Sequence, residues 1–440
     1  MIYIFLLLGL VLRLISLNQS FWIDEATTGN VVRNLSLPEI IIKFAPGDFH
    51  PPLYYLTAKI WGNVFGTNEF ALRLLSVVFA ALTIYIVYKF SKLASLFLAT
   101  SGLHIYYSQE ARMYAMEAFL VSLAVYLFTK ILHEKSRVGY WVAFAVILPL
   151  IFLTDYLPIL ILVPIWIVAI INKKNFSWWK KFLTSHIILV FSATWWFPTL
   201  LTQLNSGLKV QTLSPAWWQT LGATNLKEIL LLPTKFIIGR ISFDNKFVYA
   251  LVAITALLTF GFLLFRARSS PRIFWYWLII PVVIGAIIGF KISVFSYFRF
   301  LFVLPAFYVL VAIGVTNIKN KGLRVFLVYL ILIINLVTSA IYIFTPKFHR
   351  EDWKGLSIAL TKNPSVDVVF PSNSQEEALR YYGLGSRIVA PNPNSTSIWL
   401  IRYAQPISDP SDTTRLKVEN LGYKRDNEFD FNGVAVWEYK

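Results

Sequence analysis

The chain has 440 residues, of which 57% are hydrophobic and only 14% are charged, and its formal net charge is +17. A water-soluble domain carries about 25% charged residues, so lipid must solvate much of this chain. The absence of cysteine excludes disulfide bonds, thiolate metal sites and a cysteine nucleophile. The basic excess lies before Lys347, in the apolar part of the chain, which indicates membrane orientation rather than nucleic-acid binding.

Apolar segments suited to crossing a bilayer recur along the first 346 residues, and each crossing needs about 20 residues. They lie near residues 1–17, 72–90, 93–108, 114–132, 140–172, 185–203, 247–265, 273–290, 295–316 and 325–345. The 140–172 run is too long for one crossing, and Asp155 and Pro158 interrupt it. It therefore predicts two helices, and the total predicted is eleven.

Lysine and arginine concentrate in alternate loops, and these loops are expected to face the cytoplasm. The basic loop residues include Lys89, Lys92, Lys130, Lys135, Arg137, Lys173, Lys174, Lys180, Lys181, Arg266, Arg268, Arg272, Lys319, Lys321 and Arg324. This pattern predicts a multi-pass protein of the plasma membrane. Its N-terminus is expected on the cytoplasmic side and its C-terminus on the extracytoplasmic side. Residues 1–17 have neither a basic n-region nor a small-residue cleavage site, so we expect a retained helix, with Arg13 snorkelling at its outer end.

Residues 1–346 are predicted to form a transmembrane domain with outer loops at 18–71 and 204–246, the second of which contains Trp217 and Trp218. Residues 347–440 are predicted to form a small soluble α/β domain outside the membrane. Its expected elements are a helix at 351–361, a strand at 366–370, a helix at 375–382 and apolar runs at 387–390 and 397–403.

Acidic residues are distributed unevenly between the two predicted faces. Ten of the eleven acids before Lys347 fall on the outer side, and only Glu134 falls on the cytoplasmic side. Carboxylates contribute little to topology, so this asymmetry indicates a polar site at the outer surface. A transporter would instead place ionisable groups near the middle of the bilayer.

The first motif is Phe21-Trp22-Ile23-Asp24-Glu25, directly after the first apolar helix. Adjacent acids on a helix point about 100° apart, so they rarely serve one reacting atom. One acid is a candidate general base while the other binds a cation or the acceptor. In the alternative interpretation, Asp24 caps a helix that begins at Glu25.

The second motif is His50-Pro51-Pro52-Leu53-Tyr54-Tyr55, in which the prolines hold His50 at the surface as a hydrogen-bond donor to an anion. A structural histidine is the alternative. Tyr54 is a candidate substrate contact.

Two further motifs supply permanent cations near the outer surface. Tyr106–Tyr114 contains Glu110 and Arg112, and Ser296–Phe300 contains Arg299. Both arginines suit phosphate oxygens. The alternative for Arg112 is an ion pair with Glu110 or a lipid headgroup contact, and the alternative for Arg299 is a membrane anchor. Glu110 and Tyr114 are candidate substrate contacts.

The order and sidedness of these motifs resemble membrane glycosyltransferases of the type C fold, in the superfamily of protein O-mannosyltransferases and lipid A aminoarabinose transferases, including the bacterial family 39. The resemblance rests on the acid pair, HPPLYY, YSQEARMYA, the arginine-led late helix with Pro305 and Asp352-Trp353, and it covers residues 1 to about 360. It implies an all-α polytopic membrane protein of about 11 helices with a small C-terminal α/β extracytoplasmic domain.

The resemblance also implies a polyprenyl-phosphate-linked sugar donor and transfer with inversion at the outer face. Asp24 matches the family's presumed general base, with Glu25 beside it, and Arg112 and Arg299 match residues thought to meet the donor phosphate. His50 stands where aminoarabinose transferases have a lysine, which weakens the case for that sugar and for a phosphate contact there.

The acceptor stays open between a glycan, a lipid and a protein, and no nucleic-acid partner is expected. No cofactor is certain, and no ligand spacing predicts a metal site, although Asp24 with Glu25 would suit a divalent cation. Two other functions remain open. One is a transporter or lipid flippase for cell-envelope glycan precursors, and the other is an assembly protein whose outer domain recruits partners.

Overall fold

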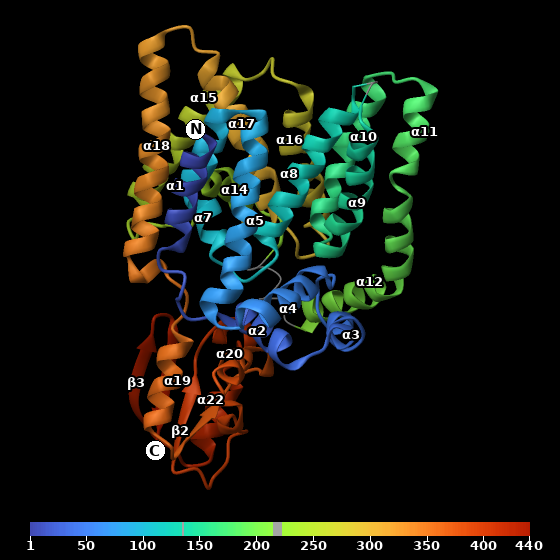
Figure 1. Cartoon of the computed structure of the whole chain (residues 1–440). Helices are drawn as coiled ribbons and strands as arrows, with labels where there is room; N and C mark the ends of the chain where they lie inside the picture. The colour runs from blue at the N-terminus through green and yellow to red at the C-terminus, as the bar shows by residue number, and fades with distance from the viewer. Residues whose placement is uncertain (134–135, 214–221) are drawn as a thin grey trace.

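A computed structural model describes residues 1–133, 136–213 and 222–440 of the chain. Glu134, Lys135, Trp217 and Trp218 lie outside the described residues. The helices form a bundle, and the C-terminal domain lies beyond one end of it, beside the first loop (Figure 1). This end is called the domain end below.

Each apolar segment predicted from the sequence is helical in the structure. The helices are α1 Ile2–Leu14, α5 Glu69–Phe90, α6 Lys92–Thr100, α7 Gly102–Ser108, α8 Tyr114–Ile131, α9 Val138–Thr154, η3 Leu157–Ile161, α10 Leu162–Ile171, α11 Phe176–Thr184, α12 Ile187–Leu213, α14 Leu226–Ile238, α15 Lys246–Arg266, α16 Arg272–Ile288, η4 Tyr297–Val303, α17 Leu304–Thr316 and α18 Lys321–Phe344.

Six helical stretches of the described chain are long and apolar enough to cross a membrane. They are Glu69–Phe90, Tyr114–Ile131, Phe176–Gln211, Lys246–Arg266, Tyr297–Thr316 and Lys321–Phe344, and four shorter apolar helices accompany them at Ile2–Leu14, Val138–Thr154, Leu157–Ile171 and Arg272–Ile288. The predicted number of eleven crossings stays a prediction.

The central helices are those that carry the predicted arginines at their ends. Within the most apolar part of each helix, 83% of the residues are buried in Tyr297–Thr316 and 72% are buried in Tyr114–Ile131. In Lys246–Arg266 only 17% are buried. Well-packed central helices hold the residues at their ends in defined positions. The peripheral helices present their apolar side chains to the surrounding lipid.

The predicted 93–108 helix is broken at Ser101, between α6 and α7. A break frees backbone carbonyls, which need hydrogen-bond donors in an apolar environment. Arg13 binds the carbonyls of Leu98 and Ala99, and Asn335 and Ser339 on α18 bind those of Phe97 and Thr100. The predicted snorkelling of Arg13 is therefore wrong, because its guanidinium is fully buried and donates to α6.

The predicted outer loop 204–246 contains helical segments among its described residues, namely the end of α12 and the whole of α14. The helix α14 packs on α7 and α15 and ends at Gly239. Gly239 has φ +68°, and a Cβ there would lie 3.2 Å from the backbone of Gly102 and Leu103. Glycine thus allows this turn to approach the start of α7 closely.

The first loop folds into short helices at the domain end: α2 Ile23–Asn34, α3 Leu37–Glu39, η1 Ile40–Phe44, η2 Ala45–Gly47 and α4 Leu53–Phe65. Helix α2 begins at Ile23 with Trp22 as its N-cap, and no side chain caps it. Asp24 therefore lies within the first helical turn, and the alternative in which it caps a helix beginning at Glu25 is wrong.

The C-terminal domain is a four-stranded sheet with helices, as the α/β prediction requires. Its principal elements are α19 Trp353–Lys362, β1 Val366–Val369, α20 Glu377–Tyr381, β2 Ser397–Ile401, α22 Thr413–Asn420, β3 Arg425–Phe431 and β4 Val434–Tyr439. The strand order is β1-β2-β4-β3, with β1 and β2 parallel and the other pairs antiparallel. Asn432 and Gly433 both have positive φ in the β3–β4 turn, as a two-residue hairpin requires.

This domain docks directly on α2. Arg33 donates to the carbonyl of Tyr381 (2.8 Å), and Asn30 donates to the carboxylate of Glu377 (2.7 Å). The ring of Phe21, just before α2, packs on the ring of Tyr381 with centroids 5.0 Å apart. The helix that carries Asp24 is thus held between the bundle and the C-terminal domain.

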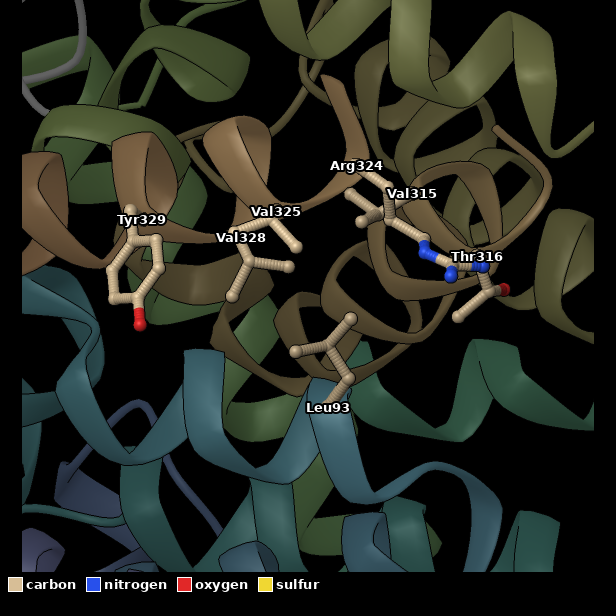
Figure 2. A pocket seen from close by; sticks show the side chains of 7 residues that line it. All are labelled: Leu93, Val315, Thr316, Arg324, Val325, Val328 and Tyr329. Carbon is tan, nitrogen blue, oxygen red and sulfur yellow. The ribbon is translucent and has the colours of Figure 1, made fainter. Parts of the chain in front are cut away.

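A surface cavity of about 390 Å³ lies at the opposite end of the bundle, between α6, α17 and α18 (Figure 2). It is lined by Leu93, Val315, Thr316, Arg324, Val325, Val328 and Tyr329. This cavity is mostly apolar and far along the helices from the acidic motifs, so it is not the candidate site.

Candidate functional site

The site is built around Asp24 in the first turn of α2. Its side chain is 43% exposed, and its Oδ2 lies 3.9 Å from a terminal nitrogen of Arg112. Arg112 comes from the short turn between α7 and α8, and its side chain is only 5% exposed. The structure thus brings a reachable carboxylate and a buried cation together from two distant motifs.

A chain of hydrogen bonds fixes the guanidinium of Arg112. Arg112 donates to the hydroxyl of Tyr55 (2.9 Å), which in turn donates to Asp48 (2.8 Å). Nδ1 of His50 lies 3.4 Å from the same carboxylate. Burial opposes the charge of Asp48, but the contacts with His50, Arg112 and Tyr55 outweigh it and lower the pKa of Asp48 to about 2. His50 and Arg112, from separate motifs, are therefore both near the Asp48 carboxylate, and their predicted contact with a donor phosphate stays a prediction.

Glu25 is engaged on both carboxylate oxygens, unlike its neighbour. Arg73 on α5 donates to Oε1 (2.7 Å) and Oε2 (2.5 Å), and the backbone amide of Ala111 also donates to Oε1 (2.8 Å). The Glu25 side chain is fully buried. Such a carboxylate holds α2 against α5 and the Arg112 turn, and it offers no free oxygen to a substrate or a cation.

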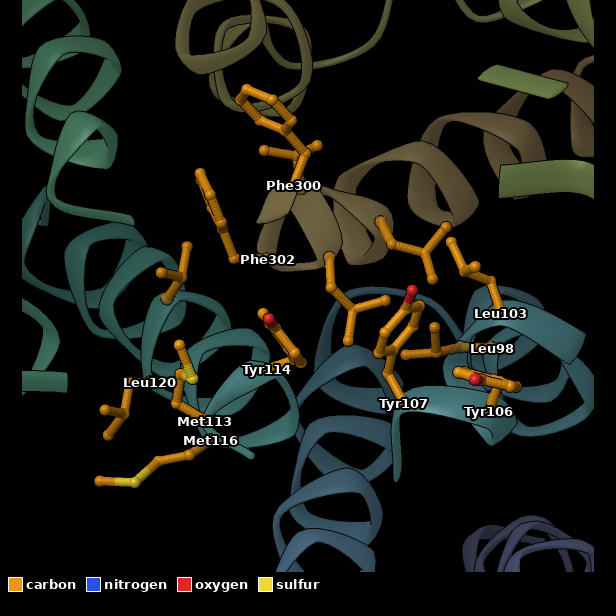
Figure 3. Packing of buried hydrophobic residues seen from close by; sticks show 14 of the residues in the cluster. Leu98, Leu103, Tyr106, Tyr107, Met113, Tyr114, Met116, Leu120, Phe300 and Phe302 are labelled. Atoms are coloured by element: carbon orange, nitrogen blue, oxygen red, sulfur yellow. The ribbon is translucent and has the colours of Figure 1, made fainter. Parts of the chain in front are cut away.

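Tyr114, at the start of α8, lies among the charged groups of the site. It is within electrostatic range of Arg112, Glu110, Arg299 and Asp24. Its ring packs on Tyr107 and on Phe298, the residue before Arg299. Figure 3 shows the rings of Tyr107 on α7 and Tyr114 on α8, both pointing toward the segment that carries Phe300 and Phe302. Arg299 thus enters the same region, and its Nε is buried without a hydrogen-bond partner among the described residues.

Glu110 faces the C-terminal domain. Its carboxylate accepts a hydrogen bond from Arg350 (2.9 Å), whose guanidinium lies 3.8 Å from the centre of the Tyr106 ring. Both side chains of the pair are almost fully buried. Burial raises the pKa of Glu110 well above its usual value and lowers that of Arg350 to about 10. Glu110 therefore links the site to the domain.

Arg240 is a further cation that sequence reasoning missed. It follows α14 directly, lies over the Tyr106 ring at 4.7 Å, and is within electrostatic range of Glu110. Arg240 has many protein atoms nearby, but solvent still reaches it. Within the described residues its side chain makes no hydrogen bond or ion pair. No local pattern marks Arg240, because its position depends on the turn at Gly239.

Tyr54 lies behind this surface. Its hydroxyl is buried without a hydrogen-bond partner in the described part of the chain, and Arg112, Glu25 and Glu110 are within electrostatic range. Asp48, Tyr55, Arg73 and Arg350 were not predicted as site residues, and each is recognisable only by its partner. Within the described ranges no group of three or more His, Asp or Glu side chains suits a metal ion.

The chain is similar to known proteins in sequence and in fold. Residues 49–198 match a family described as dolichyl-phosphate-mannose-protein mannosyltransferase. ArnT from Cupriavidus metallidurans in the apo state is similar with a TM-score of 0.60 and 13% identity, over 99% of this chain and 97% of that one. The same protein bound to undecaprenyl phosphate gives a TM-score of 0.56 at 13% identity, with the same coverage of both chains.

The oligosaccharyltransferase AglB from Archaeoglobus fulgidus, in complex with an inhibitory peptide and a dolichol-phosphate, is similar with a TM-score of 0.56 and 12% identity. The match covers 99% of this chain and 74% of that one. No curated protein sequence matches the chain. The chain therefore has the fold of the type C membrane glycosyltransferases, and the resemblance predicted from its motifs is confirmed.

Proposed function

We propose that this membrane protein is an inverting glycosyltransferase, which moves a sugar from a polyprenyl-phosphate donor to an acceptor hydroxyl at the outer face of the membrane. The observation that carries the proposal is the exposed carboxylate of Asp24, 3.9 Å from the buried guanidinium of Arg112. A carboxylate within reach of solvent suits a base, and a buried cation beside it suits a developing phosphate anion.

The reaction needs both groups around one sugar carbon. Asp24 accepts the proton of the acceptor hydroxyl as the acceptor oxygen forms its bond to the anomeric carbon. The bond between that carbon and the phosphate oxygen breaks on the opposite side, which inverts the configuration. The departing polyprenyl phosphate takes the electron pair, and Arg112 stabilises its charge.

Further cations of the site suit the donor phosphate. Arg240 follows the end of α14 and Arg299 lies on η4, and neither guanidinium is in an ion pair within the described residues. His50 is held beside Asp48, which makes it a weaker candidate than the arginines. We assign Arg112 and Arg240 as the principal phosphate contacts, Arg299 as a third, and Glu25 as a positioning residue.

Similar solved structures support the lipid-linked donor, and the positions of the basic loops support the orientation in the membrane. ArnT has been seen with undecaprenyl phosphate and AglB with a dolichol-phosphate and a peptide, which supports a lipid-linked donor. The basic loop ends lie opposite the domain end, which supports a cytoplasmic N-terminus and an extracytoplasmic C-terminal domain. The acceptor is a glycan, lipid or protein that approaches Asp24 from that side.

The test is transfer by purified protein from a panel of polyprenyl-phosphate sugars, measured as released polyprenyl phosphate. Asp24→Asn keeps the shape and removes the base, so the rate is expected to fall about 10²- to 10⁴-fold. Asp244→Asn is the matched control, because Asp244 is 89% exposed and pairs with Lys347 outside the site. Equal rates for Asp24→Asn and wild type would remove the proposed base. Movement of a lipid-linked sugar across vesicles without transfer would favour the flippase instead.

A further inference from the structure

Glu117 is a buried acid that the proposed chemistry leaves unused. It lies in the first turn of α8, and its side chain is only 1% exposed. Neither carboxylate oxygen has a hydrogen-bond partner among the described residues. A buried carboxylate without donors is costly, so this arrangement indicates that something outside the chain supplies them.

The carboxyl group facing Glu117 is that of Asp155, at the end of α9. The side chains of Glu117 and Asp155 interact directly, and Arg299 and Arg112 are within electrostatic range of Glu117. Asp155 is 7% exposed, and its Oδ1 accepts the backbone amides of Tyr156 and Leu157. Its Oδ2 accepts no hydrogen bond within the described part of the chain. When both are ionised, two facing carboxylates hold acceptors only, so a ligand bound by both must bring donors.

The position of this pair relates it to the proposed site. Tyr114 and Glu117 are three residues apart on α8 and therefore share a face of that helix. Tyr114 is within electrostatic range of Asp24 and Arg112. Glu117 lies about 4.5 Å further along the helix axis. This offset is comparable with the width of a sugar ring next to the phosphate contacts.

We infer that Glu117 and Asp155 bind the hydroxyl groups of the donor sugar and so help to determine which sugar is accepted. The inference rests on the proposed function and names the subsite for its substrate. Two acidic and two basic groups meet here, and this balance suits a neutral sugar with adjacent hydroxyls better than a cationic one. Each hydroxyl donates to a carboxylate oxygen that is otherwise unsatisfied.

The experiment compares two ligands that differ only in the sugar: undecaprenyl phosphate and the undecaprenyl-phosphate sugar that wild type uses best. Glu117→Gln and Asp155→Asn keep side-chain size and replace one acceptor oxygen with a donor. Each variant is expected to bind the sugar-bearing donor at least about tenfold more weakly and to bind undecaprenyl phosphate as wild type does. In transfer assays the KM for the donor rises, while the KM for the acceptor is unchanged.

Glu428→Gln is the control, because Glu428 lies on β3 and pairs with Arg425. A donor that lacks one sugar hydroxyl gives a second measurement. Wild type is expected to bind this donor more weakly, and at least one of the two variants is expected to show no further loss of affinity for it.

Equal weakening for both ligands would indicate a folding defect or a phosphate role and would overturn the inference. Unchanged donor binding in both variants would also overturn it and would indicate a proton shared between the carboxyl groups. Failure of wild type to bind or use any such donor would instead refute the proposed function.

Discussion

At the residue scale, the orientation of Arg112 depends on a hydroxyl rather than on a carboxylate. The Tyr55 hydroxyl accepts a hydrogen bond from Arg112 and donates one to Asp48. Burial raises the pKa of Tyr55 well above its usual value, so the hydroxyl keeps its proton. The neutral Tyr55 hydroxyl therefore links Asp48 to Arg112 and fixes the direction of the guanidinium, and Arg112 keeps its charge.

Removal of this hydroxyl tests the arrangement. Tyr55→Phe removes the Tyr55 donor to Asp48 and leaves Arg112 without its hydroxyl acceptor, a cost of about 1–3 kcal/mol in the free energy of unfolding. Because Arg112 loses its fixed direction, the transfer rate is expected to fall about tenfold or more. Tyr276→Phe on α16 is the matched control, since Tyr276 makes no hydrogen bond within the described residues. Equal rates for the two variants would exclude a role for Tyr55 in holding Arg112.

The lowered pKa of Asp48 predicts a particular pH dependence of stability. Its pKa of about 2 in the folded protein lies below the value of about 3.9 for an unfolded chain. Ionised Asp48 therefore contributes roughly 2 kcal/mol of stability, which is fully present above about pH 5 and lost as the pH falls towards 2. Thermal unfolding should therefore separate wild type from Asp48→Asn more at pH 5 than near pH 2. An equal separation at the two pH values would contradict the assignment.

At the element scale, the Glu25–Arg73 pair joins three segments. Glu25 on α2 accepts from Arg73 on α5 and from the Ala111 amide in the α7–α8 turn. Arg73 also donates to the carbonyls of Leu17, Gln19 and Ser20, in the link between α1 and α2. The pair therefore sets the distance between the helix that carries Asp24 and the turn that carries Arg112.

Breaking the pair from one side should cost stability. Arg73→Met leaves the Glu25 carboxylate buried without its cation, with an expected loss of about 3–5 kcal/mol in the free energy of unfolding. The double variant Arg73→Met with Glu25→Leu should recover part of that loss, because no buried charge remains. Thermal unfolding of the four proteins of this cycle measures the coupling. A simple sum of the two single effects would show that the pair contributes nothing as a pair.

At the scale of the whole molecule, the C-terminal domain completes the surroundings of the site. Arg350, at the start of that domain, is buried against Glu110 and Tyr106. The hydroxyl of Tyr382 accepts the amide of Phe21 and lies 3.1 Å from Glu69 at the start of α5. Contacts of this kind transmit the position of the domain to α2, and hence to Asp24.

Substitution of Arg350 tests this coupling. Arg350→Met leaves Glu110 buried without its cation, and the resulting loss of stability is expected to loosen the domain from the bundle. Cleavage by a protease between residues 345 and 352 should become faster than in wild type, and the transfer rate should fall. Arg425→Met, at an exposed pair on β3, is the control for both measurements. Unchanged cleavage and transfer would show that the domain docks independently of Arg350.

The sequence by itself determined the order of the apolar helices and the end at which the acids gather, and it predicted Asp24 and Arg112 as members of one candidate site. These features are local, because hydropathy, charge and the residues of a short motif can be read without knowing what packs against them. The β3–β4 hairpin also has a local signal in Asn432-Gly433, because both residue types adopt positive φ readily.

Only the tertiary structure decided which acid remains available for chemistry. Asp24 and Glu25 are equivalent in the sequence, but Arg73 from another helix occupies both oxygens of Glu25 and leaves Asp24 exposed. The position of Arg240 depends in the same way on packing between distant segments. So does the proximity of Glu117 to Asp155. An ion pair or an unsatisfied carboxylate is a property of two surfaces brought together, and chain order does not specify the partner.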